Sequence, residues 1–161
     1  MNIPEALQPY VVLFQVLDGY GQIWSPCGQF LGLLSSVQNN PNSIINPYGS
    51  YGSPHSPTSI QNPQGLYGTS EGIYSPYNPN SVNPPVIFYQ GHPLLLLTRN
   101  LNIFTNDLTI VDPDLMLTIY EELSNSKPAP IAKRWETLRL ALDHIANAIQ
   151  NSEMSFNYLF C

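Results

Sequence analysis

The chain has 161 residues, the length of one ordinary domain. Hydrophobic residues make up 43% of it, enough to build a core, whereas charged residues make up only 10%, well under the roughly 25% of a typical soluble domain. The net charge of −6 argues against a nucleic-acid partner, because phosphate binding needs basic patches.

Residues 1–40 are predicted to supply the first strands. Residues 10–17 are rich in β-branched and aromatic side chains, and Asp18-Gly19 after them is a hairpin turn signal. Residues 22–25 and 29–35 are the next predicted strands. A helix over residues 5–17 is the competing interpretation, although Pro9 would interrupt it. No basic residue precedes the apolar run, which is too short to span a bilayer, so we expect a cytoplasmic protein with no membrane span.

Charge is almost absent from the first half of the chain. No lysine or arginine precedes Arg99, and Glu71 is the only charged residue between Asp18 and Arg99. Such a surface pairs by hydrogen bonds and stacking, as in binding surfaces rich in Tyr, Ser, Gly and Asn. The alternative is a loop whose tyrosines pack back onto the protein's own sheet.

A 16-residue repeat fills residues 41–85, which hold nine Pro, five Gly and five Tyr. Ser, Asn and Pro recur with this period, and the unit is Ser-Ile-x-Asn-Pro-x-Gly-x-Tyr-Gly-Ser/Thr, with a decayed third copy from Ser75. Asn-Pro starts turns, Gly permits positive φ, and Ile and Tyr are apolar anchors. The pattern predicts two or three stacked turns clamped onto the body, ordered but with few regular hydrogen bonds.

The repeat resembles a bacterial module of NPYGxYGSxYSxxSIxNPYG repeats, found in cyanobacterial and other bacterial proteins of unknown function. The copies Ser43-Ile44-Ile45-Asn46-Pro47 and Ser59-Ile60-Gln61-Asn62-Pro63 carry the resemblance, which covers about residues 28–123. It implies a short strand pair before the repeats and another after Pro84-Pro85. It implies an architecture rather than an activity.

The remaining elements are predicted as a hairpin and two helices. Residues 86–89 and 94–98 form the hairpin, and residues 103–110 add a possible further strand within the 86–110 segment. Asp112 is a suitable N-cap for a first helix with Pro113 at its first position. Its expected apolar face is formed by Leu115, Met116, Ile119, Tyr120 and Leu123.

The last helix carries a seam of apolar residues at alternating spacings of four and three, from Ile131 through Trp135 to Ile149. We expect this seam to pack against the sheet, with a homodimer through the 131–149 helix as the alternative. Trp135 is central in the seam, so we expect it to be buried and its truncation to Ala to cost roughly 3 to 5 kcal/mol.

No catalytic or metal-binding signature emerges, and we expect no cofactor. Cys27 and Cys161 are interpreted as free thiols, with a disulfide between them as the minority interpretation. The three histidines lack metal-ligand spacing; His144 is expected to be solvated. A nucleophile–base pair of Cys27 and His92 finds no support in the spacing.

We therefore expect a single α+β domain over residues 1–161: a small antiparallel sheet, a long ordered repeat loop and two helices within 112–161. The leading function is a non-catalytic protein interaction or assembly module that binds a protein partner or a second copy. Glycan binding is the alternative, and a small cysteine hydrolase is third. The residues expected to bind the partner are Tyr48, Tyr51, Tyr67, Tyr74, Tyr77, Asn46 and Asn62.

Overall fold

The structure is a computed structural model that describes residues 3–105, 107–126 and 131–151. Within these residues it has a five-stranded sheet and α-helices, so the predicted α+β class is confirmed. The elements in chain order are η1 (Glu5–Leu7), α1 (Gln8–Leu17), β1 (Gln22–Trp24), β2 (Phe30–Leu33), β3 (Val86–Tyr89), β4 (His92–Leu97), β5 (Thr109–Val111), α2 (Pro113–Ser124) and α3 (Arg134–Asn151).

The sheet has the strand order β2-β1-β3-β4-β5. The pairs β1–β2, β1–β3 and β3–β4 are antiparallel, as predicted, but β4 and β5 run parallel. The sheet is therefore mixed rather than purely antiparallel. The parallel pair arises because the chain travels through residues 98–108 before it returns along β4, whereas the two-residue turn Gln90-Gly91 forces an antiparallel hairpin.

The prediction of a strand at residues 10–17 is wrong, because this segment forms α1. Pro9 lies in the first turn, where its missing N–H costs no intrahelical hydrogen bond. The buried side chains of Val11, Phe14 and Leu17 follow a helical spacing. Asp18-Gly19 ends this helix instead of closing a hairpin, and the Asp18 carboxylate accepts hydrogen bonds from the Ser36 N–H and hydroxyl at 2.7 and 2.6 Å.

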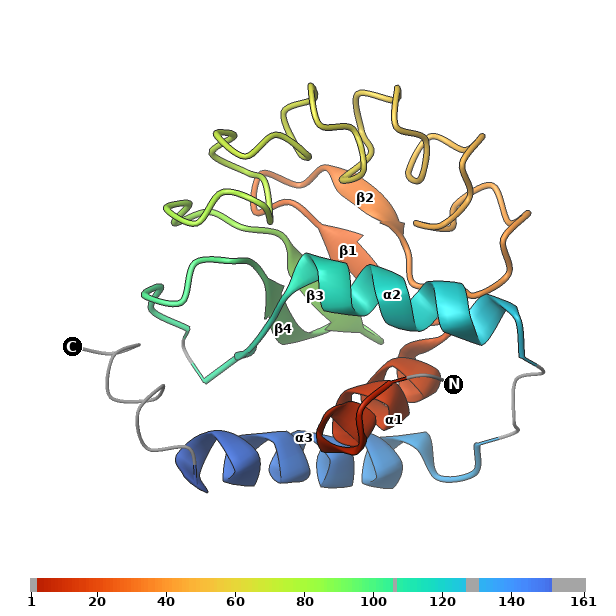
Figure 1. Cartoon of the computed structure of the whole chain (residues 1–161), viewed down its shortest axis with the longest axis vertical. Helices are drawn as coiled ribbons and strands as arrows, with labels where there is room; N and C mark the ends of the chain where they lie inside the picture. The colour runs from red at the N-terminus through yellow and green to blue at the C-terminus, as the bar shows by residue number, and fades with distance from the viewer. Residues whose placement is uncertain (1–2, 106, 127–130, 152–161) are drawn as a thin grey trace.

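One core lies between one face of the sheet, the helices and the repeat segment. Figure 1 shows α2 across the front of the sheet, α1 and α3 below it, and the repeat segment arching above it. Ile23, Ile87 and Leu95 lie opposite one another on adjacent strands and are fully buried in this core. Among the described helices, none is both long and apolar enough to cross a membrane.

The predicted start and apolar face of α2 are confirmed. The Asp112 carboxylate accepts hydrogen bonds from the N–H groups of Asp114 and Leu115 at 2.8 and 3.3 Å. Met116, Ile119 and Tyr120 are fully buried. The Tyr120 hydroxyl donates to the Phe14 carbonyl at 2.7 Å, and burial raises the pKa of this phenol well above its usual value.

The prediction that the seam of α3 packs against the sheet is wrong, because α3 packs mainly on α1. Leu138 and Ile145 of the seam are buried. The side chain of Ile149 lies outside the described residues. Trp135 is not buried as predicted, because its side chain reaches past the helix seam to the β3–β4 turn and stays 39% exposed. Its ring meets Tyr89 edge-on at 4.9 Å, and its indole N–H donates to Gln90 Oε1 at 2.9 Å.

Trp135→Ala is therefore expected to lower the free energy of unfolding by about 1–2 kcal/mol, less than for a fully buried aromatic ring, because much of the ring is already solvated. Equilibrium denaturation in urea measures the loss. Trp135→Phe, which keeps an aromatic ring but loses the indole N–H, is the control and should lose less. A loss above that of a buried core residue would contradict the partly exposed position.

Candidate functional site: the turn coil and the cavity beneath it

Residues 40–81, which we call the turn coil, form an unbroken series of tight turns that share their corner residues. From Asn40 to Ser81, the N–H of each corner donates to a carbonyl three or four residues back. Successive corners are three, three, four, three and three residues apart, so the equivalent corner of the next copy lies 16 residues further along the chain. The segment predicted as stacked turns is built of turns, but the prediction of few regular hydrogen bonds is wrong.

The asparagines of the three copies make the same two bonds. The side-chain amide nitrogens of Asn46, Asn62 and Asn78 each donate at 3.0 Å to a carbonyl six residues back. Their side-chain oxygens accept the N–H two residues ahead at 2.9–3.0 Å. The third copy thus keeps the geometry although its sequence has decayed. The side chains of Asn46 and Asn62 form hydrogen bonds within the coil, and their predicted role in partner binding stays a prediction.

Buried serines recur on the inward side of the coil, and glycines stand where the backbone leaves no room for a side chain. Ser43, Ser59 and Ser75 are fully buried, and each hydroxyl accepts the N–H two residues ahead at 3.0–3.1 Å. A Cβ at Gly52 would lie 2.3 Å from the Asn46 carbonyl oxygen, and one at Gly68 would lie 2.1 Å from that of Asn62. Glycine therefore recurs at the positions where the backbones of successive turns approach each other most closely.

The coil is fixed to the body at both ends and in the middle. At its start, the Ile44 N–H donates to the Leu33 carbonyl of β2 at 3.2 Å, which covers this edge strand. Toward its end, the Pro76 carbonyl accepts the Arg99 N–H at 2.9 Å, and the Asn100 side chain donates to the Ser81 carbonyl at 2.8 Å. Between them, the fully buried side chains of Ile44 and Ile60 join the core.

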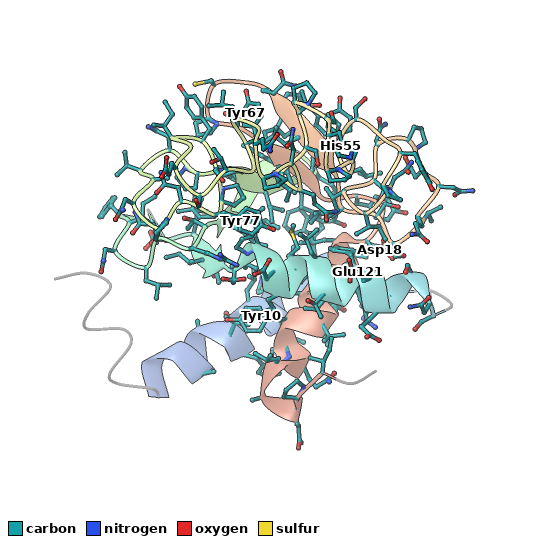
Figure 2. All side chains as sticks on the ribbon, turned by 45° about the horizontal axis from the view of Figure 1, so that its top comes forward. Tyr10, Asp18, His55, Tyr67, Tyr77 and Glu121 are labelled. Carbon is teal, nitrogen blue, oxygen red and sulfur yellow. The ribbon has the colours of Figure 1, made fainter. Side chains whose placement is uncertain are left out.

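Of the five tyrosines predicted to bind a partner, one is exposed and four pack partly against the protein itself. Tyr48 is 95% exposed, whereas Tyr51, Tyr67, Tyr74 and Tyr77 are half-buried. Tyr51 packs edge-on against Phe30 of β2 at 4.9 Å, and Tyr67 lies against the core and beside Tyr74, with ring centres 6.3 Å apart. In Figure 2, Tyr67 lies high on the coil, and Tyr77 lies lower, next to α2.

The solvent side of the coil carries large apolar side chains and almost no charge. Besides Tyr48, the exposed members are Leu66, Ile73 and Val82 just beyond the coil's end. Glu71 is the one charged residue within residues 40–81. The conformation of the coil does not require these exposed side chains, because its anchors are the buried isoleucines.

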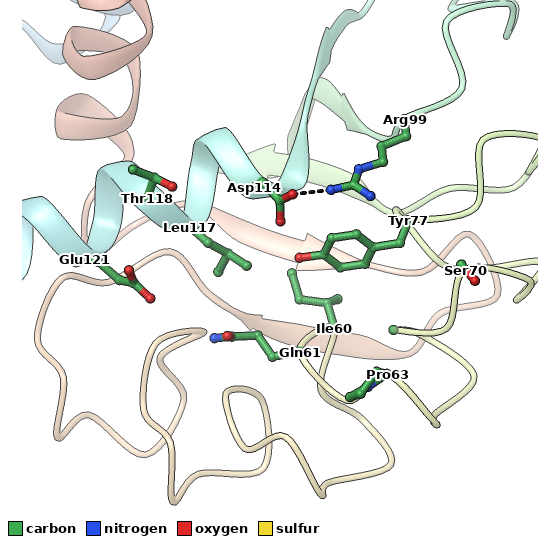
Figure 3. A pocket seen from close by; sticks show the side chains of 11 residues that line it. Ile60, Gln61, Pro63, Ser70, Tyr77, Arg99, Asp114, Leu117, Thr118 and Glu121 are labelled. Carbon is green, nitrogen blue, oxygen red and sulfur yellow. Dashed lines mark hydrogen bonds and ion pairs between the residues drawn. The ribbon is translucent and has the colours of Figure 1, made fainter. Parts of the chain in front are cut away.

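A cavity of about 520 Å³ separates the coil from α2. Figure 3 shows Ile60, Gln61 and Tyr77 on the coil side, and Asp114 and Glu121 on the helix side. Tyr77 is a predicted site residue, whereas the other polar residues of the lining are not. The signal that the sequence offers for these residues is the acidic pair Asp112 and Asp114 at the start of α2.

Arg99 and Asp114 close one end of this cavity. The Arg99 guanidinium pairs with the Asp114 carboxylate, lies 3.6 Å from that of Asp112, and sits 4.8 Å from the centre of the Tyr77 ring. Burial, followed by the charge of Asp114, raises the pKa of Tyr77 well above its usual value. The charged groups at this end of the cavity therefore interact with one another and with Tyr77.

The other candidate groups do not assemble into a reactive site. Cys27 follows Trp24, which pairs with Val86, whereas His92 pairs with Tyr89, so the two lie toward opposite ends of β3. The exposed Cys27 thiol instead neighbours Tyr74 and raises the pKa of that phenol. His144 is exposed as predicted, and Cys161 lies outside the described residues. Within those residues, no three His, Cys, Asp or Glu side chains gather as a metal site.

None of the protein-family models, curated proteins or solved structures compared with this chain matches it. The resemblance of the repeat to the bacterial module therefore stays a prediction.

Proposed function

We propose that the protein is a non-catalytic interaction or assembly module and that the solvent side of the turn coil binds a protein partner or a second copy. One observation carries the proposal: large apolar side chains project from a firmly anchored, nearly uncharged surface on which the fold does not need them. A rigid scaffold favours binding because little conformational entropy is lost on association. A cytoplasmic location remains part of the proposal, on the sequence grounds given above.

Glycan binding by the coil has less support than protein binding. It was expected to use tyrosine faces together with asparagine amides. The amides of Asn46 and Asn62 have both their nitrogen and oxygen atoms in hydrogen bonds of the coil. Four of the five tyrosines are half-buried, which leaves Tyr48 as the only fully exposed ring among them.

The double variant Tyr48→Ser, Ile73→Ser is expected to lose at least tenfold in affinity for the protein that co-purifies with the native chain, or for itself, while its circular dichroism spectrum is unchanged. Binding of the native chain should change little between low and high salt, because the surface lacks the rim charges that make association sensitive to ionic strength. Binding is measured by surface plasmon resonance, and self-association by sedimentation velocity.

Leu140→Ser is the matched control, because Leu140 is 60% exposed on α3 and away from the coil. It should bind like the native chain. If the Leu140 variant loses binding and the coil variant keeps it, the interface lies on α3, as in the alternative of a homodimer through this helix.

A further inference from the structure

A second surface lies on the face of the sheet that points away from the core. Because side chains alternate along a strand, Trp24 and Val86 point to the opposite face from Ile23 and Ile87. With Gln22 and Phe88 they form the floor of a trough of about 690 Å³ along β1 and β3. This volume falls within the range of ligand sites, which are typically aromatic-lined with a few polar groups.

The trough has no charged lining residue. Tyr20, Gln90 and Gly91 close one end, and Ser25, Pro26 and Gly28 close the other. Aromatic rings and two glutamine amides thus provide its chemistry. An uncharged lining of this kind disfavours acidic or basic ligands, which would lose their hydration without gaining an ionic partner.

The aromatic rings of Trp24 in the floor and Tyr20 at one end both pack against neighbouring side chains. The Trp24 ring packs on Phe30 with centroids 5.1 Å apart. The Tyr20 ring, 51% exposed, lies 4.6 Å from the Arg134 guanidinium, which itself donates to the Val16 carbonyl at 2.6 Å. A ligand therefore meets fixed rings, and little side-chain entropy is lost on binding.

Gln22 presents a hydrogen-bond donor to the trough. An indole nitrogen can only donate, so Trp24 fixes Gln22 Oε1 as its acceptor at 2.9 Å, and Trp135 fixes Gln90 Oε1 in the same way at 2.9 Å. The Gln22 amide nitrogen is then the donor that this side chain offers a ligand, whereas Gln90 Nε2 already donates to the Tyr89 hydroxyl at 3.4 Å. The Tyr20 hydroxyl adds another donor. The trough therefore matches a ligand rich in hydrogen-bond acceptors and poor in donors.

The pairing of the floor strands excludes strand addition by a peptide. β1 is paired on both sides by β2 and β3, and β3 by β1 and β4, so neither offers a free edge. The peptide ligand that is still compatible with the trough is an extended one that lies on the face of the sheet and presents its own carbonyls. A polyproline II segment has solvated carbonyls without internal hydrogen bonds, and its prolines have no N–H. Such segments bind aromatic-lined grooves elsewhere.

We propose that this trough binds a proline-rich peptide segment in the polyproline II conformation, through stacking on Tyr20 and Trp24 and donation from Gln22 to its carbonyls. The trough is separate from the turn coil. Its occupation therefore does not depend on the function proposed for the coil.

The test titrates the full chain with a blocked ten-residue proline peptide and follows the Trp24 indole N–H signal by NMR. We expect saturable binding that Gln22→Glu weakens at least fivefold, because a carboxylate offers no donor and repels carbonyl oxygens. Tyr20→Ser should weaken binding at least threefold. Both positions are exposed, so folding should persist, which circular dichroism checks.

Tyr48→Ser is the matched control on the coil and should leave peptide binding unchanged, which separates this proposal from the one for the coil. The proposal is overturned if the proline peptide does not bind, or if Gln22→Glu binds it as well as the native chain does. It is also overturned if a neutral glucose hexasaccharide shifts the Trp24 signal and the peptide does not, because the trough is then a carbohydrate site.

Discussion

Ile60→Ala is expected to lower the free energy of unfolding by about 3 kcal/mol, in the range for truncation of a fully buried isoleucine. Ile60 lies in the middle of the turn coil and has no exposed surface. It is one of the three isoleucines of the coil that belong to the core, with Ile44 and Ile45. The loss should appear as a shift of a single cooperative transition in denaturant, followed by far-UV circular dichroism and tryptophan fluorescence.

Ile73→Ala provides the matched control, since Ile73 belongs to the same coil but is 56% exposed. Its effect should stay within about 0.5 kcal/mol, as for ordinary surface substitutions. Equal stability of the two variants would mean that the coil is not part of the core. Two separate transitions in the native chain would mean that the coil and the body unfold independently.

Gly68→Ala is expected to destabilise the protein by about 3 kcal/mol, at the upper end of overpacking effects. The new Cβ would lie 2.1 Å from the Asn62 carbonyl oxygen and 2.7 Å from that of Ile60. Both atoms belong to the backbone, so the clash is relieved only by separating successive turns. Thermal unfolding by calorimetry measures the effect.

Gly52→Ala should cost about as much, because Gly52 occupies the same slot one period earlier and meets the Asn46 carbonyl oxygen at 2.3 Å. Ser70→Ala, at an exposed position of the same segment, is the control and should be near neutral. If Gly68→Ala and Gly52→Ala melt like Ser70→Ala, the turns are not packed as closely as described.

The parts of the fold that depend on local sequence were predictable. Asp112 with Pro113 marks the start of α2, and Gln90-Gly91 marks the β3–β4 hairpin, because caps and tight turns have residue requirements of their own. The segment 10–17 was mispredicted because an apolar run of this length fits a buried helix as well as a strand. The position of Pro9 in the first turn decides between the two, and it is compatible with a helix.

The candidate site was predictable as a segment but not as a surface. The 16-residue period marks the turn coil, since each corner requires its own residue type. The period does not show which way a tyrosine points, because Tyr48 and Tyr51 belong to the same copy and yet one is exposed and the other contacts Phe30. The trough is also invisible in the sequence, because the register of β1 against β3 brings Gln22 beside Phe88 across more than sixty residues of chain.

The corner-sharing turns also set the size of a tolerated insertion or deletion. The turn and asparagine bonds of a copy reach back three, four or six residues, and Gln61 donates to the Ile44 carbonyl of the preceding copy at 2.7 Å. Adding or removing one whole unit of 16 residues leaves every such pair in phase. A change of a single residue instead moves a bulky side chain into a glycine slot at each later corner. The turn coil is therefore expected to change in length only by multiples of 16 residues, and homologues with a longer or shorter turn coil should differ by complete units.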